Sequence, residues 1–155
     1  MGYNVKKGET EKSPFSKLEH LTAVVSNLNK AVEYYQALGI GLFESTNAVV
    51  ADRKIRGKPT DDVKLKGKMG HIGQLGFGLD QPVSGESLHK EFLETRGEGI
   101  HHLGFVVDDL EKETARLIEK GFKVISSWRY AGGGGGAYFN TDRVGGVIFE
   151  LLTGH

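Results

Sequence analysis

The sequence predicts an α+β protein built from two paired βαβββ modules that together form one half-open barrel. The first observation is an internal repeat: residues 19–28 (EHLTAVVSNL) align without a gap with residues 101–110 (HHLGFVVDDL), at a constant offset of 82. Each copy runs on into a stretch with helical spacing that stops at a glycine, Gly39 or Gly121. The second observation is the length of 155 residues, which suits one compact domain. The two repeats are therefore expected to be half-domains that share a core.

We expect a single domain over residues 17–155, preceded by a polar leader over residues 1–16 that lacks hydrophobic periodicity. The first repeat covers residues 17–82 and the second covers residues 98–155. A helical connector over residues 83–97 joins them.

The first repeat opens with an apolar strand over residues 18–25, and residues 26–29 (SNLN) supply side-chain oxygens that can cap the following helix. That helix ends at Gly39, and its apolar side chains recur at helical spacing: Ala31, Tyr34, Tyr35 and Leu38. Residues 43–61, which follow it, are polar and predict a loop, with a weakly marked strand somewhere within residues 41–50.

Residues 63–69 and 74–79 predict an antiparallel strand pair that turns at residues 70–73 (GHIG). Residues 88–93 predict the helix of the connector. The second repeat then begins with a strand over residues 100–107 and a helix capped by Asp108. This helix carries an apolar stripe of Leu110, Ala115, Leu117 and Ile118. Three further strands are expected over residues 123–128, 137–140 and 147–152.

Composition limits the classes of partner. The chain has 20 basic and 20 acidic residues, so no basic field favours nucleic acid or an anionic membrane. It contains no cysteine, which excludes disulfides, thiolate catalysis and cysteine metal sites. No apolar run is long enough for a signal segment or a membrane span. We therefore expect a soluble cytoplasmic protein with a small-molecule partner.

Side-chain alternation along the repeated strands points to one shared site. His20 and His102 occupy the same point of each copy, on the strand face opposite the one that packs on the helix. Glu150 lies within an apolar strand, where an unpaired carboxylate would be costly to bury. Two imidazoles and a carboxylate that converge on one cavity suit a divalent metal ion.

These residues resemble the vicinal oxygen chelate superfamily, and most closely its methylmalonyl-CoA epimerases. The resemblance covers most of residues 18–152 and is carried by residues 97–103 (GEGIHHL), 106–110 (VVDDL) and 145–151 (GGVIFEL), with a glycine-rich turn at 132–136. It implies metal ligands at His20, His102 and Glu150, holding one ion of cobalt, nickel, zinc, manganese or iron. It also implies a homodimer.

The chain departs from this resemblance at Gly78, where the family has a fourth ligand, Glu or Gln. The internal repeat agrees, because Gly78 aligns with Glu150. Asp80 and Gln74 share that strand face but lie roughly 7 and 13 Å along the strand. A metal held by three protein ligands and a metal-free site both stay open.

A second departure concerns proton transfer. The resemblance implies a catalytic glutamate on the middle strand of the first half, but residues 63–68 (VKLKGK) contain no carboxylate. Lys64 is the nearest match and could move a proton or stabilise an enolate. The alternation of Lys64, Lys66 and Lys68 also fits a solvated strand face, and we expect His101 to face the helix layer or solvent.

The predicted function is that of a racemase or epimerase, which inverts an acidic α-carbon next to a carbonyl. The candidate catalytic residues are Glu150, His20, His102 and Lys64. The candidate substrate-binding residues are Trp128, Tyr130, Tyr138 and Gly78, although core packing could also explain the aromatic ones.

Two substrates fit this prediction. One is a methylmalonyl-CoA-like thioester; the other is a flat aromatic ketone, an isoflavanone, since dihydrodaidzein racemases also resemble these epimerases. The alternatives are an extradiol-type dioxygenase with a two-histidine, one-carboxylate site, a glyoxalase-like lyase, and a non-enzymatic small-molecule binding protein.

Overall fold

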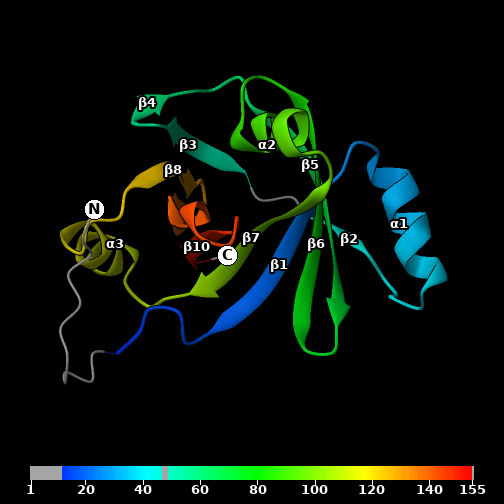
Figure 1. Ribbon diagram of the computed structural model, residues 1–155, viewed down its shortest axis with the longest axis horizontal. Helices are drawn as coiled ribbons and strands as arrows, with labels where there is room; N and C mark the ends of the chain where they lie inside the picture. The colour runs from blue at the N-terminus through cyan, green and yellow to red at the C-terminus, as the bar shows by residue number, and fades with distance from the viewer. Residues whose placement is uncertain (1–11, 47–48, 155) are drawn as a thin grey trace.

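The structure is a computed structural model that describes residues 12–46 and 49–154. Ten strands form one curled mixed sheet in the order β2-β5-β6-β1-β7-β10-β9-β8-β3-β4, with α1, α2 and α3 packed on it (Figure 1). The elements are β1 (Leu18–Val24), α1 (Leu28–Ala37), β2 (Glu44–Ser45), β3 (Val50–Ile55), β4 (Lys58–Pro59), β5 (Lys64–Ile72), β6 (Leu75–Ser84), α2 (Leu88–Arg96), β7 (Gly99–Val106), α3 (Leu110–Glu119), β8 (Val124–Tyr130), β9 (Gly135–Phe139), the 3-10 turn η1 (Thr141–Arg143) and β10 (Ile148–Thr153).

The predicted α+β class with two paired modules is confirmed. The two halves meet where β1 pairs antiparallel with β7 at the centre of the sheet. Each of these strands also pairs in parallel with the last strand of its own half, β1 with β6 and β7 with β10. The internal repeat is therefore a structural repeat, and its two leading strands lie side by side.

The predicted loop over residues 43–61 is wrong in part. The strand expected within residues 41–50 is the short β2, but residues 50–59 form a hairpin of β3 and β4, which turns at Arg56 and Gly57, both with positive φ. β3 does not join its own half, because it pairs with β8 of the second half and places Arg53 opposite Trp128. The hairpin of the first half thus extends the edge of the sheet formed by the second half.

Two local predictions also shift. β5 and β6 continue to Ile72 and Leu75, so the turn lies at residues 73–74 and not at 70–73. The cap of α3 is Asp109, whose side chain accepts a hydrogen bond from the backbone N–H of Lys112, and not Asp108.

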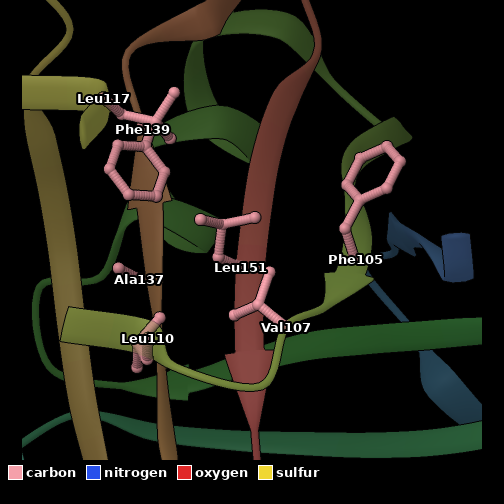
Figure 2. Close-up of a cluster of buried hydrophobic side chains, with 7 residues drawn as sticks. All are labelled: Phe105, Val107, Leu110, Leu117, Ala137, Phe139 and Leu151. Atoms are coloured by element: carbon pink, nitrogen blue, oxygen red, sulfur yellow. The ribbon is translucent and has the colours of Figure 1, made fainter. Parts of the chain in front are cut away.

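The core lies between the helices and the sheet. α3 covers one apolar cluster, and Figure 2 shows its members on α3, the adjoining β7 segment, β9 and β10: Phe105, Val107, Leu110, Leu117, Ala137, Phe139 and Leu151. α1 covers the matching cluster of the first half. Of the expected leader, residues 1–11 lie outside the described residues, whereas Phe15 packs against Phe105 and Phe149 at ring distances of 5.1 Å. No helix within residues 12–46 and 49–154 is long and apolar enough to cross a membrane.

Candidate active site

The central strands bring His20, His102 and Glu150 together, and all three are buried. Nε2 of His20 lies 3.1 Å from Oε1 of Glu150 and 3.4 Å from Nε2 of His102. Nε2 of His102 lies 4.0 Å from the same carboxylate oxygen. The two imidazoles and the carboxylate therefore converge on one point, as the repeat predicts.

Gly104 makes this approach sterically possible. It lies in register with His20 on β1 and with Glu150 on β10. A Cβ atom at position 104 would lie 2.6 Å from Oε1 of Glu150 and would overlap the His20 ring. Only glycine leaves His20 room to reach across β7 to Glu150.

The environment of the three groups separates their protonation behaviour. Burial alone would lower the pKa of His20, but Glu150 and Glu19 outweigh it and raise the pKa to about 9. Burial raises the pKa of Glu150, while His20 opposes the rise. Burial, followed by the nearby His101, lowers the pKa of His102 well below its ordinary value. Near neutral pH the site therefore holds a cationic His20 beside a neutral His102.

A second buried group adjoins His102. Nδ1 of His101 lies 2.9 Å from Nδ1 of His102, and the His101 ring stacks on His89 of α2 at 4.3 Å. Nε2 of His89 lies 3.3 Å from Asp80 and 3.4 Å from the Tyr138 hydroxyl. His101 thus faces α2 and not solvent. Sequence reasoning did not select His89, which occupies no repeated position, and it considered Asp80 only as a substitute for the missing fourth ligand.

The residues present fit a divalent metal at one of two candidate clusters. Candidate ligand atoms of His20, His102 and Glu150 lie within 4.8 Å of one another, and Oε1 of Glu150 accepts no well-oriented hydrogen bond. The His89, His101 and His102 nitrogens are equally close. However, the first two rings are stacked, so their lone pairs run side by side and do not converge as a metal site requires.

Gly78 stands where the resemblance implies a fourth metal ligand, and a side chain has no room there. Gly78 lies in register with Thr22, and a Cβ atom there would lie 2.5 Å from the Thr22 hydroxyl oxygen. Asp80 is engaged with His89, and Gln74 lies in the turn before β6. Within the described part of the chain, the cluster of His20, His102 and Glu150 therefore offers three candidate ligands.

The site opens into a cavity of about 1100 Å³ bounded by both halves and by the β3–β4 hairpin. Trp128 and Tyr138, with ring centroids 4.7 Å apart, and Tyr130 form an aromatic wall. Arg53 lies over Trp128, 5.9 Å from the ring centroid.

Of the other residues that the sequence singled out, some line the cavity and others do not. Lys64 and Lys66 line it with exposed side chains, whereas Lys68 does not. Asp61, which the sequence did not single out, also lines it. Gly78, expected to touch substrate, is not a lining residue, because Thr22 occupies the adjoining space.

A comparison with models of known protein families identifies the family of this chain. The model of the Glyoxalase/Bleomycin resistance protein/Dioxygenase superfamily matches residues 19–140. The chain belongs to this superfamily. Its candidate ligands His20, His102 and Glu150 lie on the central strands β1, β7 and β10.

Individual relatives are distant. A solved Mycobacterium tuberculosis methylmalonyl-CoA epimerase superposes with a TM-score of 0.65 at 22% identity, covering 94% of this chain and 92% of that one. A Streptomyces coelicolor methylmalonyl-CoA epimerase variant, in complex with 2-nitronate-propionyl-CoA, superposes with a TM-score of 0.67 at 22% identity, covering 90% and 94%. The Bacillus subtilis (strain 168) uncharacterized protein YqjC is 22% identical over 139 residues, covering 88% of this chain and 91% of YqjC. Similarity at this level establishes the shared fold alone.

Proposed function

We propose that this protein is a racemase or epimerase that removes a proton from a carbon next to a carbonyl and returns it to the opposite face. The observation that carries the proposal is the buried Glu150 carboxylate, which adjoins His20 and His102 and lines the large cavity. Burial raises the pKa of this carboxylate, although its ion pair with His20 opposes the rise, and a raised pKa suits a group that accepts a proton from carbon.

Inversion needs groups on both faces of a planar intermediate. Glu150 takes the α-proton, and the electron pair of the C–H bond moves into the enolate. His20 and His102 lie on the same side as Glu150 and face the developing negative charge on oxygen. Lys64 lines the cavity from β5, on the other half, and is the proposed donor to the opposite face. Its ammonium proton restores the C–H bond with inverted configuration, and solvent exchange resets both groups.

A metal ion is compatible with this scheme. His20, His102 and Glu150 would hold one divalent ion, which supplies Lewis-acid polarisation of a carbonyl oxygen. The histidines orient the oxygen in either case.

The aromatic wall favours a flat aromatic ketone, an isoflavanone such as dihydrodaidzein. Trp128 and Tyr138 are largely buried and pack edge to face, but both line the cavity with aromatic surface that a planar substrate can contact, and Arg53 lies at the same wall. A methylmalonyl-CoA-like thioester is the other substrate to test, because the solved relatives are methylmalonyl-CoA epimerases.

The test is to incubate one enantiomer of dihydrodaidzein, and separately one epimer of methylmalonyl-CoA, with the enzyme and to follow the appearance of the opposite enantiomer or epimer by chiral chromatography. We expect racemisation of the isoflavanone. Conversion of the thioester alone would reassign the substrate, and no conversion of either compound would contradict the proposal.

A second function is supported by one observation, the cluster of two histidines and one carboxylate, which suits non-haem iron. It predicts oxygen uptake when the protein, loaded with ferrous iron, meets a catechol. Oxygen uptake without racemase activity would favour this ring-cleaving dioxygenase function.

Size-exclusion chromatography with light scattering tests the expected homodimer.

A further inference from the structure

Each half of the sheet contains one pair of facing residues, on neighbouring parallel strands, at equivalent positions of the repeat. In each pair one residue is glycine and the other is polar, but the glycine is on the last strand of the first half and on the first strand of the second half. In the first half Thr22 on β1 lies in register with Gly78 on β6. In the second half Gly104 on β7 lies in register with Glu150 on β10. The repeat aligns Thr22 with Gly104 and Gly78 with Glu150. Each pair thus combines one polar side chain with one glycine, but on opposite strands.

Steric limits explain why each pair keeps a glycine. A Cβ atom at Gly78 would lie 2.5 Å from Oγ1 of Thr22 and 3.2 Å from Cε of Met69. A Cβ atom at Gly104 would lie 2.6 Å from Oε1 of Glu150. In both halves, therefore, one oxygen stands directly over the glycine of the neighbouring strand. In the first half this oxygen belongs to Thr22 on β1, and in the second half it belongs to Glu150 on β10.

Thr22 is placed to meet a ligand. It is buried, lines the cavity, shares a strand face with His20 and lies in register with His102. A hydroxyl can donate a hydrogen bond, whereas an ionised carboxylate only accepts one. The exchange of sizes therefore places a neutral donor on β1, against the residue of β6 at which the repeat would otherwise place a second carboxylate.

We infer that the Thr22 hydroxyl is a catalytic group that donates a hydrogen bond to the substrate's carbonyl oxygen as it becomes an enolate oxygen. The inference rests on the proposed proton-transfer function and deepens it. A second carboxylate at this corner would repel that oxygen, whereas the hydroxyl stabilises it in the transition state more than in the ground state.

The first test replaces the hydroxyl by a methyl group of similar size. Thr22→Val should lower kcat for racemisation by about 100-fold, with KM within about threefold, because the lost bond forms mainly in the transition state. Thr22→Ser keeps the hydroxyl and should retain kcat within about tenfold of the wild type. Thermal unfolding should show that both variants fold.

The outcomes separate the two proposals. If Thr22→Val keeps the wild-type kcat while Glu150→Gln loses activity, the role of Thr22 is wrong and the proposed function stands. If the wild type converts neither substrate, the proposed function itself fails.

The second test does not depend on activity. Titration calorimetry with Mn²⁺ compares Thr22→Gly, Gly78→Glu and the double variant. If Thr22 occupies this corner, only the double variant has room for a fourth ligand, and it should bind Mn²⁺ at least about tenfold more tightly than Thr22→Gly. Equal tightening by Gly78→Glu alone, or no tightening in the double variant, would overturn the placement. If Gly78→Glu does not fold, the comparison of the double variant with Thr22→Gly still decides.

Discussion

The ion pair between His20 and Glu150 predicts that folding stability falls as the pH rises from 6.5 to about 9. In the folded protein the pKa of His20 is about 9, against an ordinary value of 6.5. The folded state therefore binds this proton more tightly than the unfolded state does. The resulting stabilisation is fully present below pH 6.5 and is lost as the pH rises through 9. At about 1.4 kcal/mol per pKa unit, the difference is worth about 3 kcal/mol.

The assay is urea denaturation in the presence of a chelator, at intervals between pH 6 and pH 10. His20→Gln removes the titrating group, and His71→Gln, at an exposed histidine, is the matched control. The free-energy difference between the wild type and His20→Gln should shrink by about 3 kcal/mol across this range, and the His71→Gln difference should stay constant. A pH-independent difference for His20→Gln would refute the electrostatic reasoning.

Three further predictions follow from the site. Gly104→Ala should destabilise the fold by about 1–3 kcal/mol through overlap with His20, whereas Gly132→Ala, which has open space around it, should stay within about 0.5 kcal/mol of the wild type in urea denaturation. Lys64→Met should lower racemisation by at least about tenfold, while Lys68→Met, outside the cavity, should not; equal effects in a chiral assay would remove Lys64 from the mechanism. Trp128→Leu should raise KM for an aromatic ketone more than for a thioester, and equal changes would argue against stacking.

The central part of the fold was predictable because its signals are local and duplicated. The strands that carry His20 and His102 each run into a capped helix, and their alternation already places both histidines on one face. The structure brings Glu150 to the same point, because β10 pairs in parallel with β7.

The hairpin of β3 and β4 could not be read from the sequence. Residues 50–59 are polar, and their strand character comes from pairing with β8, some seventy residues away along the chain. His89 was missed for a related reason, since a single histidine in a short connector helix carries no pattern. Its burial against His101 and Asp80 depends on how α2 packs on the sheet.

The alignment of Gly78 with Glu150 indicated a missing carboxylate but not its cause. The cause is a contact between strands, because the Thr22 hydroxyl fills the space that a side chain at position 78 would need. A sequence comparison of the two repeats shows both exchanges, but only the parallel register of β1 with β6 shows that they belong together.

The central claim is that Glu150 takes a proton from the substrate's α-carbon. The most direct measurement is deuterium incorporation at that carbon in D₂O, followed by NMR with dihydrodaidzein, for the wild type and for Glu150→Gln. The wild type should incorporate deuterium at the α-carbon, and Glu150→Gln should do so at least about 100-fold more slowly while remaining folded. Equal rates in the two proteins, or no incorporation by the wild type with either the ketone or the thioester, would contradict the claim.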